Sequence, residues 1–224
     1  LSIHKTVDTL LETDSDVLVI NEFGMGSNLS QQEPFCLEQV AANVATKRLE
    51  QHGYKVFSSR TFFPTAIATR LPVVCCRDIA LDLERHALLL VVKTADNNHV
   101  AVFGAHLSHL SAMDRNCEMR VLLSHIFPND ATPILVVGDF NQPRPQDYSA
   151  MEWHNLCDRK QQQCLEHVDD GVPKMLESCG CSCIWDTNDN SKPLSKNWTT
   201  PHPPATHWTG TIVDYTYFRG ISIR

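Results

Sequence analysis

An apolar stretch that ends in polar residues constrains this 224-residue chain more than any other feature. Residues 133–137 are apolar throughout, and this pattern predicts a strand buried on both faces. The run ends at Gly138, and Asp139 and Asn141 follow at once. Residues two apart at a strand's end point the same way, so a charged carboxylate is expected beside an amide that donates and accepts hydrogen bonds.

Two interpretations fit this strand end. Phosphate chemistry with a hard cation such as Mg²⁺ uses one charged oxygen ligand beside one neutral hydrogen-bonding group. Asp139 and Asn141 are also common turn formers, so a plain turn explains the pair equally well when it is considered alone. The other strand ends of the chain must therefore decide between the two.

The composition favours one folded domain over residues 1–224. Hydrophobic residues make up 42% and charged residues 20%, which allows a sizeable core. The formal charge of −7 argues against a broad basic face for nucleic acid, although a metal ion can supply positive charge for phosphates. Apolar runs such as residues 87–92 are too short to span a bilayer, so no transmembrane segment is expected.

The cysteine pattern bears on the cellular compartment. Nine cysteines are too few for a disulfide scaffold in a chain of this length, and no Cys-x-x-Cys pair indicates structural zinc. Reduced thiols and an intracellular setting are therefore favoured. The glycosylation sequons at residues 28–30 and 197–199 keep secretion open as the alternative.

Periodicity and turn residues divide the chain into short elements. Helices are expected at residues 3–11, 34–52, 113–127 and 148–156. Strands are expected at residues 17–20, 54–59, 65–70, 73–83, 87–93, 100–107, 133–140 and 211–218. Poor periodicity over residues 158–204 indicates a long loop or an insertion of short helices.

The strand arrangement gives more specific predictions. Strands 65–70 and 73–83 are expected to pair around Leu71-Pro72, and strands 87–93 and 100–107 are expected to form a hairpin. The apolar face of the 113–127 helix is expected to consist of Met113, Cys117, Val121 and Leu122. Strands that follow one another without helices, beside strands that flank helices, predict an α+β fold with sheets packed face to face and helices outside.

Polar side chains recur where predicted strands end. Besides Asp139 and Asn141, these positions hold Glu22, His106 and Asp214. Each alone is more simply explained as a solvated turn residue or a hydrogen-bonded core residue. Together they are harder to explain that way, because buried carboxylates cost free energy unless they are paired or bound to metal.

Five short motifs run through these positions, in the order Asn21-Glu22, Ala66-Ile67-Ala68-Thr69-Arg70-Leu71-Pro72-Val73, Gly104-Ala105-His106-Leu107, Gly138-Asp139-Phe140-Asn141 and Val213-Asp214-Tyr215-Thr216-Tyr217. They resemble the Gln-Glu, Ala-Ile-Leu-Ser-Arg…Pro-Ile, Thr-His-Leu, Gly-Asp-Phe-Asn and Ile-Asp-Tyr-Ile-Phe motifs of the endonuclease/exonuclease/phosphatase superfamily. The Gly-Asp-Phe-Asn motif is the most specific, and the motifs cover nearly the whole chain. The resemblance implies a deoxyribonuclease-I-like fold, an α+β four-layer sandwich of two mostly antiparallel sheets.

The resemblance also implies a role for each site residue in a metal-dependent hydrolase of phosphodiester or phosphomonoester bonds. Glu22 would bind Mg²⁺ or Mn²⁺, and His106 would contact a phosphate oxygen and be oriented by Glu84. Asp139 would align or activate the attacking water. Asn141 would bind the phosphoryl group through a hydrogen bond, and Asp214 would orient a catalytic histidine.

Two motifs of the superfamily have no counterpart in this sequence. The Asn of its opening strand would precede Leu1, and its final Ser-Asp-His would follow Arg224, which suggests a domain truncated at both ends. A catalytically inactive binding or scaffold module with the same fold is therefore the alternative to an enzyme.

The substrate class stays open at this stage, as does the oligomeric state. Nucleic acid, a phospholipid, an inositol phosphate and a nucleotide are the candidate phosphoesters. The four tryptophans, Trp153, Trp185, Trp198 and Trp208, are interpreted as loop anchors in preference to stacking or lipid-contacting residues. Arg115 and Arg144 are expected on solvated helix or loop faces, although both follow predicted site motifs closely.

Overall fold

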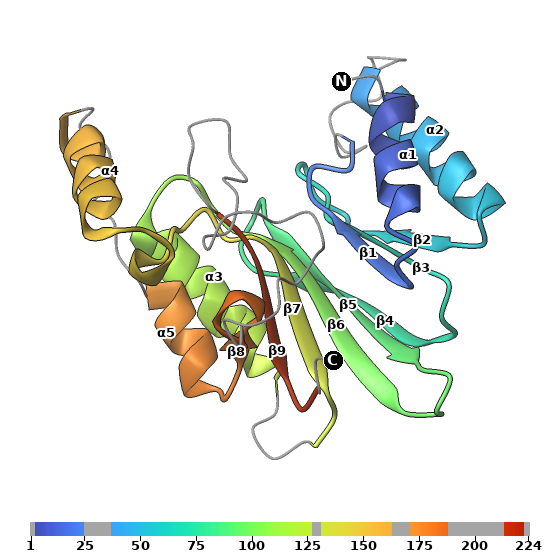
Figure 1. The fold of residues 1–224 in the computed structure, drawn as a ribbon. Helices are drawn as coiled ribbons and strands as arrows, with labels where there is room; N and C mark the ends of the chain where they lie inside the picture. The colour runs from blue at the N-terminus through green and yellow to red at the C-terminus, as the bar shows by residue number, and fades with distance from the viewer. Residues whose placement is uncertain (1–2, 25–36, 127–130, 163–170, 188–212, 222–224) are drawn as a thin grey trace. The chain divides into compact units, whose positions relative to one another are not determined.

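The computed structural model describes residues 3–24, 37–126, 131–162, 171–187 and 213–221 (Figure 1). The chain forms two compact units. Unit 1 contains residues 1–106 and 132–138, and unit 2 contains residues 107–131 and 139–224. Strand β7 (Ile134–Asp139) therefore begins in unit 1 and ends in unit 2.

Three short strands of unit 1 form an antiparallel sheet in the order β1-β3-β2. The central strand β3 (Ala66–Thr69) lies between β1 (Val17–Ile20) and β2 (Lys55–Ser58). All four residues of β3 are buried, which fits a strand covered on both faces. The small alanine side chains of β3 let the neighbouring layers approach closely.

Two helices of unit 1 cover one face of this small sheet. Figure 1 shows α1 (Ile3–Glu12) and α2 (Leu37–Gln51) on the same side of the three strands. They meet the sheet in a core cluster of Val7, Leu18, Ala45, Leu49, Tyr54 and Ala68. The helical spacing of the apolar residues in α1, read from the sequence, is thereby confirmed.

The second sheet has six strands in the order β4-β5-β6-β7-β9-β8. Its remaining strands are β4 (Val73–Ala80), β5 (His86–Lys93), β6 (His99–His106), β8 (Ser182–Cys183) and β9 (Asp214–Arg219). Strands β5 and β6 form the expected antiparallel hairpin, with Leu88 opposite Gly104 and Lys93 opposite His99. Strand β4 pairs with β5 and carries a register irregularity between Val73 and Cys75.

The two sheets pack face to face inside unit 1. The shared core cluster consists of Ile67, Leu88, Leu90, Val92 and Val102. The contact is closest at Gly104, where an added Cβ would lie 2.9 Å from Thr65 Cγ2 and 3.1 Å from Val19 Cγ1. The prediction of an α+β sandwich with helices outside its sheets is therefore confirmed.

Unit 2 contains the remaining helices and the strand pair β8-β9. Helix α3 (Ala112–Ser124) packs against α5 (Gly171–Ser178). Helix α4 covers Ala150–Gln162, and short 3₁₀ turns cover Pro145–Asp147 and Ile184–Thr187. Within the predicted 158–204 segment, residues 158–162 belong to α4, and residues 171–187 contain α5, β8 and a 3₁₀ turn, in agreement with the short-helix alternative for the described part of this insertion.

One predicted strand pairing is wrong. Strand β3 pairs with β1 and β2, and β4 pairs with β5, so residues 65–70 and 73–83 belong to different sheets. The Leu71-Pro72 segment looks like a hairpin turn because proline is a turn former. Here it carries the chain from one sheet of the sandwich to the other, a step that local turn chemistry does not distinguish from a hairpin.

The predicted apolar face of α3 is also largely wrong. Met113 is 72% exposed and Cys117 is exposed, whereas Arg115, Glu118, Met119 and Leu122 are buried. Two long polar side chains occupy the inner face, so hydrophobic spacing selects the wrong side of the helix. Strand β7 differs from its prediction too, because buried residues alternate with half-buried ones along it.

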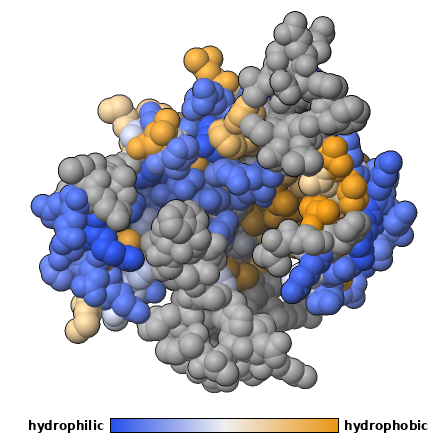
Figure 2. Space-filling model, turned by 90° about the horizontal axis from the view of Figure 1, so that it is seen from above, coloured by the Kyte–Doolittle hydropathy of each residue, from blue (hydrophilic) through white to orange (hydrophobic). Residues whose placement is uncertain are grey.

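Some predictions fall on residues that lie outside the described ranges, among them the helix start expected at Pro34 and the strand start expected at residues 211–212. Among the residues coloured in Figure 2, hydrophilic ones predominate, with several smaller hydrophobic areas. The exposed large hydrophobic residues include Val74, Leu83, Leu110, Met113 and Met151. Among the described helices, none is long and apolar enough to cross a membrane.

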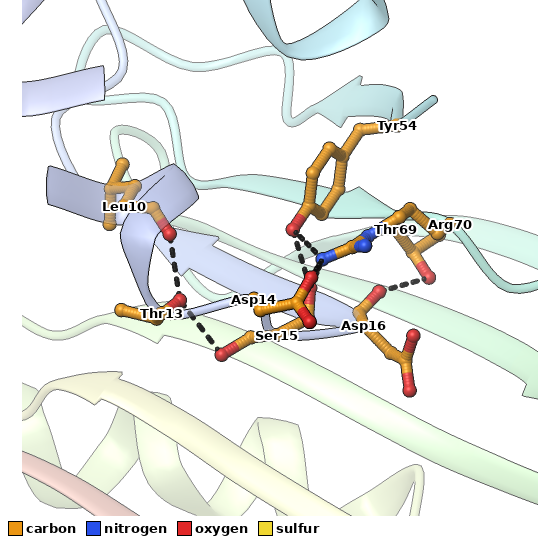
Figure 3. Close-up of polar contacts among 8 residues, drawn as sticks. All are labelled: Leu10, Thr13, Asp14, Ser15, Asp16, Tyr54, Thr69 and Arg70. Atoms are coloured by element: carbon orange, nitrogen blue, oxygen red, sulfur yellow. Dashed lines mark hydrogen bonds and ion pairs between the residues drawn. The ribbon is translucent and has the colours of Figure 1, made fainter. Parts of the chain in front are cut away.

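A polar cluster joins the start of β2 and the end of β3 to the turn after α1 (Figure 3). Arg70 donates hydrogen bonds through Nη2 to Asp14 Oδ1 at 2.8 Å, to the Ser15 carbonyl at 3.1 Å and to Tyr54 Oη at 2.8 Å. The buried Tyr54 hydroxyl in turn donates to the Ser15 carbonyl. The α1–β1 turn, β2 and β3 are therefore joined through one phenol group.

A close backbone approach fixes the end of β7 against β6. Gly138 has a φ of 153°, and an added Cβ would lie 1.8 Å from the carbonyl oxygen of Ala105. A backbone atom cannot move aside as a side-chain tip can. Only glycine therefore lets the strand that leads to Asp139 lie this close to the strand that leads to His106.

We predict that Tyr54→Phe lowers the free energy of unfolding by about 1–2 kcal/mol, because it removes the hydrogen bonds of a buried hydroxyl while it keeps the ring. Urea denaturation measures this change. Asp14→Asn is the matched control in the same cluster, because Asp14 is 87% exposed and asparagine also tolerates its positive φ of 48°. An equal loss in both variants would contradict the central role of the phenol.

We also predict that Gly138→Ala destabilises the protein by about 3 kcal/mol or more, through both the clash with Ala105 and the unfavourable φ. Gly53→Ala provides the comparison, because Gly53 has a φ of 86° but no atom within 4 Å of the added Cβ. That variant should lose only about 1 kcal/mol. Thermal unfolding of both proteins tests the difference, and similar melting temperatures would disprove it.

Candidate active site

The end of β1 holds the proposed metal ligand Glu22 in a turn that is fastened to the start of β3. Asn21 Oδ1 accepts a hydrogen bond from Thr65 Oγ1 at 3.2 Å, and the Phe23 N–H donates to the Pro64 carbonyl at 2.9 Å. Glu22 lies between them, is exposed and has a φ of 54°. A glutamate in the left-handed region costs about 1–2 kcal/mol, so contacts on both sides must hold it there.

His106 is the last residue of β6 and is 5% exposed. Residues two apart on a strand share a face, so His106 lies on the same face of β6 as Gly104, the face that meets the small sheet. Its ring contacts the Phe63 ring edge-on, with centroids 6.3 Å apart. The loop between β2 and β3 therefore forms one wall around this histidine.

The same loop contacts the turn that contains Glu84. Thr61 Oγ1 donates a hydrogen bond to the Glu84 carbonyl, and the Arg85 guanidinium lies over the Phe63 ring with its Cζ 4.6 Å from the centroid. Phe63 thus has Arg85 on one side and His106 on another. The Glu84 side chain is exposed, and its predicted role of orienting His106 stays a prediction.

Residues 139–141 of the Gly-Asp-Phe-Asn stretch form a tight turn in unit 2. The Asn141 N–H donates to Asp139 Oδ1 at 2.7 Å, and the Asn141 side chain donates through Nδ2 to the Leu107 carbonyl at 2.9 Å. Leu107 also donates its N–H to the Asp139 carbonyl at 2.9 Å. Asn141 adopts a φ of 49°, a conformation that asparagine tolerates better than most residues.

The turn is also attached to the strand that carries Asp214. The Phe140 N–H donates to the Val213 carbonyl at 2.9 Å, and the Phe140 ring stacks on that of Tyr215 with centroids 6.3 Å apart. Phe140 is 1% exposed, so the aromatic contact is part of the core. Unit 2 therefore brings Asp139 and Asn141 together and holds their turn against the beginning of β9.

Two buried residues of α3 hold the segment that follows His106. The sequence analysis does not predict this role for either residue. Glu118 accepts a hydrogen bond from the Ser108 N–H through Oε2 at 2.7 Å, and Arg115 donates through Nη1 to the Ser108 carbonyl at 3.3 Å. The expectation of a solvated Arg115 is wrong, because its exposed fraction is 3%. Arg115 and Glu118 are three residues apart, which places both side chains on one face of the helix, and this spacing is the sequence signal that indicates their shared position.

Arg144 was likewise expected to be solvated but is fully buried. It forms ion pairs with Asp147 and Asp186, each with a shortest N–O distance of 2.7 Å. Burial disfavours its charge, but hydrogen bonds to Asp186 and Asp147 outweigh this effect, so the pKa of Arg144 is raised. A buried guanidinium with two carboxylate partners could not be recognised from sequence, because Asp186 is 42 residues away.

The described residues contain no cluster of three or more His, Cys, Asp or Glu side chains that could hold a metal ion. Mg²⁺ keeps several waters and needs only one or two carboxylates together with substrate phosphates, whereas structural zinc needs four protein ligands. An exposed, rigidly held carboxylate such as Glu22 fits the first of these requirements.

Two other sequence-based interpretations concern tryptophans and thiols. Trp153 contacts the Tyr148 ring at a centroid distance of 5.7 Å, which fits an anchoring role, whereas Trp198 and Trp208 lie outside the described residues. All cysteines within the described ranges are free thiols. Burial raises the pKa of the Cys183 thiol to about 12, so this sulfur is an unreactive core group.

Comparison with known proteins identifies the fold. No protein-family model matches the sequence, and no curated protein matches it. The human nocturnin catalytic domain with bound sulfate anion matches 97% of this chain and 73% of its own, with a TM-score of 0.61 and 14% identity. A mannosyl-6-phosphatase from Bacteroides thetaiotaomicron matches 97% of this chain and 76% of its own, with a TM-score of 0.64 and 12% identity.

An endonuclease/exonuclease/phosphatase from Beutenbergia cavernae matches 96% of this chain but 58% of its own, with a TM-score of 0.63 and 14% identity. At such identities the likeness concerns the path of the backbone and not the chemistry of the site. The matches extend over nearly all of this chain, as the sequence motifs do. The protein therefore has the fold of the endonuclease/exonuclease/phosphatase superfamily.

Proposed function

We propose that this protein is a hydrolase of phosphodiester or phosphomonoester bonds that requires Mg²⁺ or Mn²⁺. Structures with the same fold include a phosphatase and a catalytic domain with bound sulfate, an anion of the shape and charge type of phosphate. The proposal also draws on the motifs at Glu22, His106, Asp139, Asn141 and Asp214.

Backbone strain at Glu22 is the observation that carries the proposal. Positive φ angles at non-glycine residues occur, within the described ranges, at Asp14, Glu22, Asn97 and Asn141. Asp14 and Asn97 are residue types that favour this region in ordinary turns, but glutamate is not. Strain of this kind persists where surrounding contacts impose it, and it gathers at functional sites.

In the Gly-Asp-Phe-Asn turn, we assign the attacking water to Asp139 and the phosphoryl group to Asn141. Asp139 Oδ1 accepts the Asn141 N–H, which orients the carboxylate so that its other oxygen can align or activate a water molecule. The Asn141 side chain donates one N–H to the Leu107 carbonyl, so its second N–H remains to donate to a phosphoryl oxygen. In-line attack of water on phosphorus needs this kind of alignment.

Glu22 is the residue that we assign to the metal, and His106 to a phosphate oxygen. When bound, the metal supplies positive charge where negative charge develops on the phosphate. His106 can donate a hydrogen bond from an imidazole that Phe63 and the strand hold in place. Glu84 is assigned to orient this imidazole, and Asp214 to orient a general acid or base.

We also propose which phosphoesters are suitable substrates. An acidic protein with a formal charge of −7 is poorly suited to long duplex DNA, because phosphate contacts along a duplex require a row of Lys and Arg. A nucleotide, an inositol phosphate, a phospholipid head group or a short nucleic acid needs only a local site. Activated phosphodiesters and phosphomonoesters are therefore the first compounds to assay.

We predict that EDTA abolishes hydrolysis of bis-p-nitrophenyl phosphate and that added Mg²⁺ or Mn²⁺ restores it. Glu22→Gln keeps the shape of the side chain but removes its charge, so it should raise the half-maximal Mg²⁺ concentration roughly tenfold or more, in line with the loss of a charged oxygen ligand. Glu12→Gln, at an exposed position on α1, should leave it unchanged. Activity that persists in EDTA would rule out the metal-dependent mechanism.

We further predict that Asp139→Asn lowers kcat roughly 100-fold or more, because it removes the charge that acts on the water. Its amide oxygen still accepts the Asn141 N–H, so the free energy of unfolding should change by less than about 1 kcal/mol. Asp96→Asn in the exposed β5–β6 turn is the control. A folded wild-type protein that binds phosphoesters without hydrolysing them would support the binding-module alternative instead.

A further inference from the structure

Arg144 is the most deeply buried charge among the described residues of unit 2. Its guanidinium donates to both oxygens of Asp147, from Nε at 3.0 Å and from Nη2 at 2.7 Å. It also donates to both oxygens of Asp186, from Nη1 at 2.9 Å and from Nη2 at 2.7 Å. Each of the two carboxylates thus accepts two hydrogen bonds from the same guanidinium.

This arrangement excludes a direct role in binding phosphate. Arg144 has five N–H donors, and the two carboxylates take four of them. One positive charge faces two negative charges, so the local field repels a further anion. The exposed fraction of the side chain is 0%, which also prevents contact with a substrate in solution.

The aromatic partners of Arg144 belong to the strand that begins at Asp214. The guanidinium carbon lies 5.4 Å from the centroid of the Tyr215 ring and 6.0 Å from that of Tyr217. The Arg144 N–H donates to the Tyr215 hydroxyl at 3.1 Å. Burial, followed by the nearby charge of Asp147, raises the pKa of Tyr215, so its hydroxyl stays protonated.

The same two tyrosines also hold the Gly-Asp-Phe-Asn turn. The Phe140 ring lies 6.3 Å from Tyr215 and 6.0 Å from Tyr217, measured between centroids. Phe140, directly before Asn141, and Arg144, three residues after it, therefore both contact the Tyr215 and Tyr217 rings. The segment from Phe140 to Arg144, which contains Asn141, is thereby fixed at both ends, and Asp139 directly precedes its first attachment.

We propose that Arg144 is a positioning residue that fixes the Asp139–Asn141 turn against the Asp214 strand. The inference that this matters for turnover rests on the proposed hydrolase function. The attachment of the turn through Arg144, which we call the clamp, does not rest on that function, because it can be observed in the protein without substrate. A displacement of about 1 Å in a catalytic group can lower a rate roughly 100-fold.

Arg144→Lys is the decisive variant, because lysine keeps the charge but cannot form two parallel pairs of hydrogen bonds. Amide hydrogen exchange is measured by NMR on the whole chain. We expect Phe140 and Asn141, whose N–H groups bond to Val213 and Asp139, to exchange at least roughly tenfold faster. Amides of α3 in the same unit should keep their rates within about twofold.

Activity gives the second readout. In the same variant kcat should fall roughly 10- to 100-fold while KM changes less than about threefold, because no substrate contact is lost. Arg159→Lys, at an exposed position on α4, is the matched control. Asp186→Asn, which weakens the clamp from its half-exposed side, replaces Arg144→Lys if the latter does not fold.

Three results would overturn the proposal. They are unchanged exchange at Phe140 and Asn141, equally accelerated exchange throughout α3, or an unchanged kcat in an active protein. The second would show that Arg144 serves global stability alone. If the wild type does not hydrolyse phosphoesters, the hydrolase function fails, and the exchange data still decide whether the clamp exists.

Discussion

The backbone of Leu107 is the point on which the arrangement of unit 2 depends. The turn after β7 bonds to both of its polar groups, with the Asp139 carbonyl accepting its N–H and the Asn141 side chain donating to its carbonyl. An unmet buried backbone group costs about 1–3 kcal/mol, so both bonds are strongly favoured.

Polar attachments position several of the proposed site residues, while His106 packs against the Phe63 ring. Glu22 and Asn141 keep positive φ angles because hydrogen bonds hold the residues beside them. Arg115, Glu118 and Arg144 lie in the interior and bond to loops rather than to substrate. Buried ion pairs contribute little net stability, since desolvation offsets their attraction, but they specify one geometry. That property suits a site whose chemistry depends on alignment.

The sequence predicts those parts of the fold that local chemistry determines. Strand β1, the β5–β6 hairpin and α1 follow from apolar periodicity and turn residues. The link at Leu71-Pro72 and the inner face of α3 do not, because both depend on partners distant in sequence. The motifs locate Asp139 and Asn141 correctly at a strand end. Arg144 escapes such reasoning, because an isolated arginine in a proline-rich loop resembles a surface residue until Asp186 and Tyr217 are brought beside it.

The double use of Asn141 explains how one residue type can satisfy both interpretations of the strand end. As a turn former, asparagine accepts the left-handed conformation at little cost, and its amide anchors the turn to Leu107. That anchor fixes the orientation of the amide, which directs the remaining N–H and the oxygen away from the Leu107 carbonyl. The turn conformation of Asn141 and its proposed ligand-binding role are thus compatible. Replacement by aspartate would keep the backbone conformation but would set two negative charges two residues apart and remove the donor to Leu107.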